Sequence, residues 1–583
     1  MIYYLRCDNI YINRNMISIF KIKHEGGNKI MIVSEAIVRI LEKEGITDAF
    51  GIPGAGINGL YKFMGKCNIS HYTVRHEEAA VHAAGGYYRA SGKLAAALCT
   101  SGPGATNFTT GLYTAMIDSI PLIAITGQAV TAHLGKDAFQ CVDIATIVAS
   151  VTKKSWCVTD KEKVVETFHE AFRIAKEGKP GPVLIDLPLD VQNAEIDFEP
   201  DSYTPYPVEK ISPSEEEIQK AVEMLRKAKN PVIIMGGGVV EANACEQCVE
   251  LAELFNIPVI TTYMAKGGIP IDHPLNAGHA GIQVGQPIGN QVLMDSDVVL
   301  GIGCRFTDRH TGSIKEYCGN RRFIHINVEP KEINKIFPAD LGIVSDAKLA
   351  IEALLKETIR QKVEKRENTI SYLAGLRTAL ERKTNQNCIP IHPHRVFGTM
   401  NEAFDSDTLF TTGCGITQIW SGQLQKIDKP RHYLPSGGAG TLGYDIPGAF
   451  GAMTAKPGKR AVAVMGDFGF TFHVQELATC AKYNRPVIVV IVNNAYLGLI
   501  RQNQKYAYGY EYAVEMKENH GFVDYVKVAE GLGCAGERVF KPEDLVPAMK
   551  RAQKSMKPYI IDVIVEEQAD CSMGNSIDKV VEH

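Results

Sequence analysis

The sequence predicts an α/β protein of three consecutive domains, each built on a doubly wound parallel sheet. Three observations support this prediction. The chain has 583 residues, which is more than a single hydrophobic core accommodates. Short apolar runs typical of buried strands alternate with helical patterns in three separate blocks. Two polar connections divide the blocks, one rich in proline and one rich in charge.

The first block is expected to span residues 31–197. Residues 34–41 have the spacing of an amphipathic helix. Buried strands are expected at 94–99, 122–126 and 182–187.

The leader, residues 1–30, has a doubtful status. It is rich in Asn, Ile and Lys and has no apolar region long enough for a signal peptide. Gly26-Gly27 can be encoded by a purine-rich sequence typical of a bacterial ribosome-binding site. We therefore expect Met31 to be the true start of the protein.

The second and third blocks follow the two connections. The proline-rich segment 196–213 leads into a block at 213–360, and the charged, helical segment 356–385 leads into a block at 390–583. Strands are expected at 231–235, 258–261, 298–302 and 323–326 in the second block, and at 461–465, 487–492 and 560–565 in the third.

The composition excludes several classes of protein. Hydrophobic residues make up 45% and charged residues 22% of the chain, as in ordinary soluble proteins. The net charge is −4 and both signs are dispersed, so neither nucleic acid nor a membrane is expected as a partner. The 14 cysteines are scattered without a disulfide framework, which suits the cytoplasm.

The strongest chemical signal lies in the third block. Asp467 ends one predicted strand and Asn494 ends the next, so one βαβ unit separates them. Both strand ends face the same edge of a parallel sheet, where open α/β folds bind ligands. Carboxylate and amide oxygens suit Mg²⁺, and glycines allow a diphosphate to approach the backbone. A pair of plain turns is the alternative, and the Asn493-Asn494 pair at this spacing disfavours it.

This pattern resembles the cofactor motif of thiamin-diphosphate-dependent enzymes, with Phe468 at a position that is usually glycine. The resemblance implies that Asp467, Asn494 and the carbonyl of Tyr496 hold Mg²⁺. It implies further cofactor contacts from Gly466, Phe468, Gly469, Tyr496, Leu497 and Gly498.

The first block resembles the pyrimidine-binding domain of the same family. Phe50-Gly51-Ile52-Pro53-Gly54 looks like the opening turn, in which Pro53 and Gly54 contact the cofactor. Arg75-His76-Glu77 begins the family's RHE segment. The resemblance implies that Glu77 meets N1′ of the aminopyrimidine and assists proton transfer there. A carboxylate at a helix N-terminus is the bland alternative for Glu77.

Three further segments resemble the acetohydroxyacid-synthase-like branch: 101–107 (SGPGATN), 137–140 (DAFQ) and 440–443 (GTLG). The resemblance places Gln140 with Glu77 at the catalytic centre and Lys153 at the substrate. It implies that Gly440 accepts a hydrogen bond from the cofactor and that Leu442 wedges it into a bent shape.

The middle block resembles the FAD-binding domain of that branch, where the flavin is structural. Gly236, Arg305 and Asp346 stand at positions expected to contact FAD. The third block is most similar to the glyoxylate carboligases, with Leu499, Arg501 and Asn503 expected near the substrate. A surface helix arginine is the alternative for Arg501. Asn503 replaces a tryptophan of the anabolic acetohydroxyacid synthases.

The resemblance implies a carboligase for small 2-oxo acids, active as a homodimer or homotetramer. The favoured reaction joins two glyoxylates to give tartronate semialdehyde and CO₂. Glyoxylate carboligases typically replace the glutamate found here as Glu77, so an acetolactate synthase acting on pyruvate stays open. A pyruvate-oxidase-like enzyme, a simple decarboxylase and a catalytically silent protein are the remaining alternatives.

Overall fold

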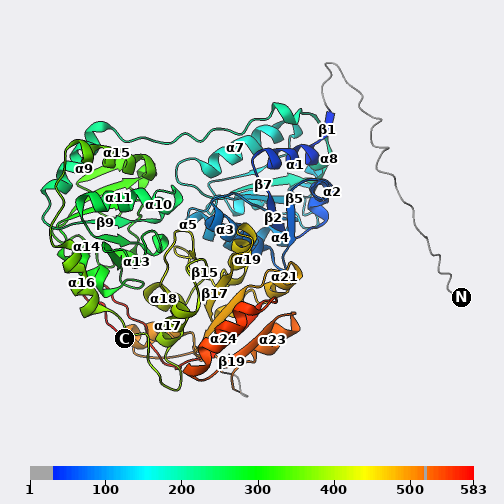
Figure 1. Ribbon diagram of the computed structural model, residues 1–583. Coiled ribbons are helices and arrows are strands. Elements are labelled where there is room, and N and C mark those ends of the chain that lie inside the picture. Colours follow the sequence, from blue (N-terminus) through cyan, green and yellow to red (C-terminus); the bar gives the residue numbers. More distant parts are fainter. Residues whose placement is uncertain (1–29, 518–520) are drawn as a thin grey trace, which may run out of the picture.

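The computed structural model describes residues 30–517 and 521–583 and contains three α/β domains (Figure 1). The expected leader lies outside the described residues, apart from Ile30. This residue begins β1 (Ile30–Ile32), which pairs antiparallel with β8 (Glu195–Asp197). Three six-stranded parallel sheets confirm the predicted fold class. None of the helices in the described ranges is long and apolar enough to cross a membrane.

The first domain, blue to cyan in Figure 1, has the strand order β3-β2-β4-β5-β7-β6. Its strands are β2 (Asp48–Gly51), β3 (Ser70–Thr73), β4 (Ala96–Cys99), β5 (Ile123–Gln128), β6 (Lys154–Cys157) and β7 (Val183–Pro188). Its helices are α1 (Val33–Lys43), α2 (Asn58–Met64), α3 (Glu77–Ser91), α4 (Pro103–Thr106), α5 (Phe108–Ile117), α6 (Ile144–Ile147), α7 (Val164–Lys176) and α8 (Leu189–Asn193).

The middle domain, green in Figure 1, has a different strand order, β11-β10-β9-β12-β13-β14. Numbered within the domain this is 3-2-1-4-5-6, the order of dinucleotide-binding folds. Its strands are β9 (Pro231–Met235), β10 (Val259–Thr261), β11 (Asn276–His279), β12 (Val298–Ile302), β13 (Arg322–Asn327) and β14 (Leu341–Val344). Its helices are α9 (Glu215–Lys227), α10 (Gly237–Glu241), α11 (Cys245–Phe255), α12 (Pro287–Asp295), α13 (Asp308–Thr311), α14 (Ile314–Cys318) and α15 (Ala347–Arg360).

The third domain, yellow to red in Figure 1, has the strand order β16-β15-β17-β18-β20-β19, which matches the first domain. Its strands are β15 (Leu409–Thr412), β16 (Tyr433–Pro435), β17 (Ala461–Gly466), β18 (Ile488–Asn493), β19 (Ala535–Val539) and β20 (Tyr559–Ile564). Its helices are α17 (Pro393–Ala403), α18 (Ile416–Leu424), α19 (Asp445–Ala455), α20 (Asp467–Phe470), α21 (Glu476–Lys482), α22 (Gly498–Asn503), α23 (Tyr525–Gly531) and α24 (Pro542–Lys554).

The connection expected to be helical over 356–385 is only partly so. A non-helical break at 361–368 separates α15 from α16 (Thr369–Leu380). Leu373 is the only residue that α16 buries fully, and Leu376 packs partly buried beside it. The segment therefore acts as a connection and contributes little to the core.

The first and third domains share a hydrophobic core, whereas the middle domain has cores of its own. One cluster of buried residues runs from Phe50 and Ala83 in the first domain to Phe450 and Ile560 in the third. Helices α3 and α19 pack closely at its centre. Glycines make this approach possible, because a Cβ on Gly86 would collide with the backbone of α19.

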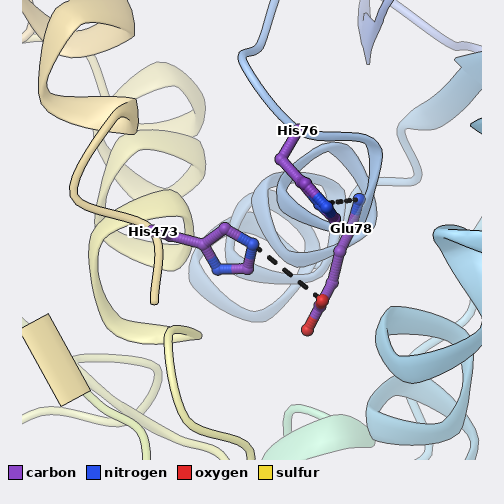
Figure 2. A group of neighbouring side chains, drawn as sticks. All are labelled: His76, Glu78 and His473. Atoms are coloured by element: carbon purple, nitrogen blue, oxygen red, sulfur yellow. Dashed lines mark hydrogen bonds and ion pairs between the residues drawn. The ribbon is translucent and has the colours of Figure 1, made fainter. Parts of the chain in front are cut away.

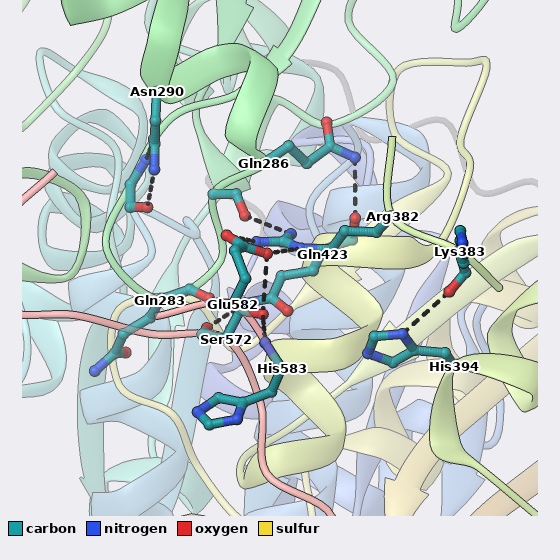
Figure 3. Close-up of polar contacts among 12 residues, drawn as sticks. Gln283, Gln286, Asn290, Arg382, Lys383, His394, Gln423, Ser572, Glu582 and His583 are labelled. Atoms are coloured by element: carbon teal, nitrogen blue, oxygen red, sulfur yellow. Dashed lines mark hydrogen bonds and ion pairs between the residues drawn. The ribbon is translucent and has the colours of Figure 1, made fainter. Parts of the chain in front are cut away.

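The C-terminal segment contacts both the connection after α16 and the third domain (Figure 3). Arg382 donates to both carboxylate oxygens of Glu582, at 2.7 and 2.8 Å. The Gln423 amide donates to the Ser572 carbonyl at 2.6 Å, and Ser572 in turn accepts from the backbone N–H of His583. The segment thereby forms the wall against which α22 packs.

Candidate active site

The ends of β17 and β18 form one edge of the third sheet, as predicted. Gly466 pairs with Val492 in the ladder, so Asp467 and Asn494 leave the sheet at neighbouring positions. Both side chains are buried. The Asn494 amide nitrogen donates to the Glu567 carbonyl at 3.3 Å, which directs the amide oxygen the other way, toward the N–H of Tyr496. The edge thus presents two side-chain oxygens close together.

The Asp467 carboxyl group has the properties expected of a metal ligand. Burial raises its pKa to about 7. No ion pair to Asp467 occurs among residues 30–517 and 521–583. A buried carboxylate is costly unless it is paired or bound to a metal, so a divalent cation would favour the charged form. The oxygens of Asp467 and Asn494 fit Mg²⁺.

Leu442 and Gly440 approach this edge from the turn before α19. A Cβ placed on Gly469 would lie 3.6 Å from the Leu442 side chain, so the turn contacts α20. Gly440 has a φ of 61°, a conformation that favours glycine. Gly498 is confined as well, because a Cβ there would lie 2.8 Å from the Asn494 amide nitrogen. Leu442 and Gly498 therefore lie at the predicted diphosphate site.

A second group of predicted residues gathers in the first domain. The Asn107 amide donates to Glu77 Oε2 at 2.9 Å, and Glu77 is half-buried at the start of α3. A Cβ on Gly104 would lie 3.3 Å from Glu77 Oε1. Gln140 lies beside Gly102, whose Cβ would be 2.8 Å from that of Gln140. The loop after β4 therefore joins Glu77 and Gln140 in one place.

Gly54 completes this group. A Cβ on Gly54 would lie 2.5 Å from the Thr100 side chain, so the turn after β2 touches the loop after β4. The hydroxyl group of Thr100 also accepts from the N–H of Gly56 at 3.1 Å. Pro53 is exposed beside this contact. In the strand order of this domain, the contact lies at the topological switch point, where ligands bind.

The two groups remain separate within one chain. Among the described residues, no hydrogen bond or ion pair joins Glu77 to Asp467, Asn494 or the turn at 440–443. The domains touch nearby at the Thr114 and Thr441 hydroxyl groups, 2.6 Å apart, and where Glu476 accepts from the N–H groups of Arg75 and His76. Among the described residues, each group therefore lies within its own domain.

The middle domain contributes a cavity of about 350 Å³ that also reaches the first and third domains. Its lining includes Gly237, Gly238, Arg305, Arg309, Glu241 and Asp346. Gly236 lies just behind this lining, where its backbone approaches the Gly303 carbonyl too closely for any side chain. The tips of β9 and β12 meet there, at the switch point of the domain. Glycine backbone and two arginines fit a dinucleotide such as FAD.

The predicted substrate residues have different surroundings. Lys153 donates to the Glu177 carbonyl at 2.6 Å, and burial lowers its pKa to about 8. Leu499 is half-buried and Asn503 is exposed on α22.

Arg501 is fully buried and ion-paired with Asp570 and Glu511. The surface alternative for Arg501 is therefore wrong, because tertiary packing buries this face of α22. Its role toward substrate stays a prediction, and a substrate carboxylate would have to compete with Asp570.

Two buried charged residues that line the middle-domain cavity were missed from the sequence, Asp118 and Lys266. Asp118 is buried, accepts from the N–H groups of Gly437 and Gly438, and lines the cavity. Burial lowers the pKa of Lys266 to about 7, and its amino group donates to the Gly422 carbonyl at 2.6 Å. Each is an isolated charge in a mostly apolar stretch, which is the only sequence signal they give.

Comparison with known proteins agrees with this arrangement. Three domains of thiamine pyrophosphate enzymes match the chain: the N-terminal TPP binding domain at 31–147, the central domain at 218–354 and the C-terminal TPP binding domain at 413–563.

Individual relatives cover almost the whole chain. A glyoxylate carboligase of Escherichia coli O157:H7 is 45% identical over 94% of this chain and 95% of its own. A probable acetolactate synthase large subunit of Methanocaldococcus jannaschii is 38% identical over 91% and 92%. An acetolactate synthase large subunit of Corynebacterium glutamicum is 38% identical over 92% and 87%. The chain therefore belongs to the thiamine pyrophosphate enzyme family.

Proposed function

We propose that the protein is a thiamin-diphosphate- and Mg²⁺-dependent carboligase that joins two glyoxylates into tartronate semialdehyde and releases CO₂. The observation that carries this proposal is the 45% identity to a glyoxylate carboligase over nearly the full length of both chains. Asn503 supports it as well, because an exposed polar side chain at this position of α22 suits a small substrate and a polar product.

In this proposal Asp467, Asn494 and the Tyr496 carbonyl hold Mg²⁺, and the metal holds the diphosphate. Bound thiamin diphosphate supplies a carbon nucleophile and accepts the electrons left behind when CO₂ departs. Glu77 shares a proton with N1′ of the cofactor. Asn107 holds Glu77 Oε2, which leaves Oε1 to face the ring nitrogen.

We propose that the two half-sites combine across a homodimer, which a homotetramer would contain twice. The separation of Glu77 from Asp467 within one chain supports this assembly. Phe139, beside Gln140, is 87% exposed, and Phe472, beyond α20, is 44% exposed. A partner chain could cover both of these side chains.

FAD is the proposed occupant of the middle cavity, held by Arg305 and the backbone near Gly236 in a structural role. The dinucleotide-type strand order of the domain supports this assignment. We also propose a cytoplasmic location, which suits the free thiols of the described cysteines.

The alternative is an acetolactate synthase acting on two pyruvates, and Glu77 favours it because glyoxylate carboligases typically lack this acid. Both candidates are tested by incubating the full chain, with thiamin diphosphate, Mg²⁺ and FAD, with glyoxylate, pyruvate or both, and identifying the products. Tartronate semialdehyde from glyoxylate alone supports the main proposal. 2-Acetolactate as the dominant product supports the alternative, and oxygen uptake with pyruvate would indicate a pyruvate-oxidase-like enzyme.

A further inference from the structure

Three metal-ligating side chains meet outside both half-sites: His76, Glu78 and His473 (Figure 2). Each offers one ligand atom, and these atoms all lie within 4.8 Å of one another. His76 and Glu78 belong to the start of α3 in the first domain. His473 belongs to the segment between α20 and α21 in the third domain. The cluster therefore spans the junction of two domains.

The His473 ring is held in one protonation state. Its Nδ1 lies 3.0 Å from the Gly443 carbonyl, which only accepts, so Nδ1 carries the proton. The ring is buried, which disfavours its charged form. Nε2 therefore presents a lone pair, and it points toward Glu78 in Figure 2. Metal-binding histidines are typically oriented in this way.

The Glu78 carboxylate, which is also a hydrogen-bond acceptor, faces this lone pair. Its Oε1 bonds to Nε2 of the buried His82 at 3.1 Å, and its Oε2 lies 3.9 Å from His473 Nε2. A carboxylate oxygen and an imidazole lone pair repel each other unless a proton, a water molecule or a metal cation lies between them. A tetrahedral Zn²⁺ with bonds of about 2.0–2.1 Å separates its ligand atoms by about 3.4 Å. A small movement of either side chain would suffice.

His76 is the adjustable member of the cluster. Its Nδ1 accepts the N–H of Glu78 at 3.2 Å and so caps α3. Its ring centre lies 5.3 Å from that of His473. Binding of a metal would require this cap bond to be given up, whichever ring nitrogen is used. The backbone is fixed independently, because Glu476 of the third domain accepts from the N–H groups of Arg75 and His76 at 2.8 and 3.0 Å.

We propose that His76, Glu78 and His473 bind one Zn²⁺ ion, which clamps the start of α3 to the third domain. Two imidazoles and one carboxylate suit Zn²⁺ and other late transition metals, whereas the oxygen ligands near Asp467 suit Mg²⁺. The clamp would fix the helix that begins with Glu77. Water would fill the remaining position.

The test uses full-length protein saturated with Mg²⁺ and thiamin diphosphate, so that the Asp467 site is occupied. Co²⁺ is titrated while its visible absorption is recorded, and bound Zn²⁺ is measured after dialysis. We expect one Co²⁺ or Zn²⁺ per chain that excess Mg²⁺ does not displace. We also expect Zn²⁺ to raise the thermal unfolding midpoint.

His473→Asn is the decisive variant. The asparagine amide can still donate to the Gly443 carbonyl, as Nδ1 does, but Nε2 is lost. We expect at least a tenfold loss of Co²⁺ affinity and no stabilisation by Zn²⁺. His273→Asn is the matched control, because His273 pairs with Glu253 at 3.1 Å without a third ligand. Its Co²⁺ affinity should equal that of the wild type.

Three results would overturn the proposal: wild-type protein that binds no Co²⁺, binding that excess Mg²⁺ abolishes, or equal affinity in the His473→Asn protein. If His473→Asn does not fold, Glu78→Gln replaces it. Glu78→Gln retains the side-chain size and removes the charge, and undiminished Co²⁺ binding there would equally contradict the clamp.

Discussion

The first and third domains have the same strand order but carry different chemistry at the corresponding edge. In each, the third strand of the domain, β4 or β17, ends at the switch point. After β4 comes the neutral loop Ser101-Gly102, whereas after β17 comes the buried acid Asp467. The shared topology therefore provides two equivalent places for ligands, and the residues decide which ligand fits each.

The two acids also differ in how deeply they are buried. Asp467 is 2% exposed and its raised pKa fits a hard cation. Glu77 is half-buried and is steadied by the neutral Asn107, which fits a heterocyclic nitrogen. Moreover α3, which carries Glu77, and α19 are equivalent helices that pack against each other. We therefore predict that a change in Asp467 impairs metal and cofactor binding, whereas a change in Glu77 impairs proton transfer.

Asp467→Ala should have the largest effect. Loss of the only carboxylate at the proposed Mg²⁺ site should abolish Mg²⁺-dependent retention of thiamin diphosphate, with activity falling by more than about 100-fold, beyond the range typical of changes next to metal ligands. Binding is measured by calorimetry with and without Mg²⁺.

Asp186→Asn is the matched control for that change. Asp186 lies in β7 of the first domain, and burial raises its pKa to about 7 as well. Its replacement should leave cofactor affinity unchanged. If Asp467→Ala and wild type have equal cofactor affinity, the metal binds elsewhere. The proposed difference between the two sheet edges would then be wrong.

Glu77→Gln tests the first-domain edge. Gln can still contact N1′ but is a poor proton partner, so activity should fall on the order of 10²-fold, the scale of general acid–base effects. Cofactor affinity should hardly change. The measurement is the exchange rate of the cofactor C2 proton, followed by NMR. A wild-type exchange rate in the variant would refute the role of Glu77.

The sequence predicted the strand ends at these sheet edges well, because the apolar run of a strand and the motif that follows it are adjacent in the chain. The strand expected at 461–465 is β17, and the one expected at 231–235 is β9. Weakly apolar strands such as β3 and β19 were not predicted, because their burial depends on neighbouring strands. Asp118, Lys266 and the His473 cluster were missed for a related reason. Their partners lie in another domain, and no local pattern reports such contacts.

The middle domain sharpens the comparison through its different strand order. Gly236→Ala should force β9 and β12 apart at the Gly303 carbonyl and cost about 1–3 kcal/mol, the scale of overpacking. The flavin bound per chain should fall with it. Thermal unfolding and flavin absorbance are the measurements.

Gly375→Ala is the control for Gly236→Ala, because it adds the same methyl group at a glycine that has room for it. Gly375 is exposed in α16, with nothing within 4 Å of an added Cβ. Alanine should stabilise this helix by up to about 1 kcal/mol. If the Gly236→Ala protein keeps its flavin, the contact between Gly236 and Gly303 is not part of the dinucleotide site.

Asn503→Trp should have the smallest effect and bears on substrate choice. Asn503 is exposed on α22, whose position is fixed by hydrogen bonds of Gln502 to the N–H and carbonyl of Cys571, at 3.0 and 2.8 Å. An indole would fill space beside the acceptor and replace a polar wall by an apolar one. One methylene in a hydrophobic pocket is worth roughly 1–3 kcal/mol, so we expect a shift in product ratio toward larger acceptors and no complete switch.

The measurement for this variant is the product ratio when glyoxylate, pyruvate and 2-oxobutyrate compete as acceptors. Asn503→Ala is the control, because it removes the amide without filling the space. A shift with Trp but not with Ala would identify ring volume as the cause, and an equal shift in both would identify the lost amide. If both variants give the wild-type ratio, Asn503 does not face the acceptor. The preference for glyoxylate over pyruvate would then rest on overall similarity alone, while the contrast between the two edges would stand.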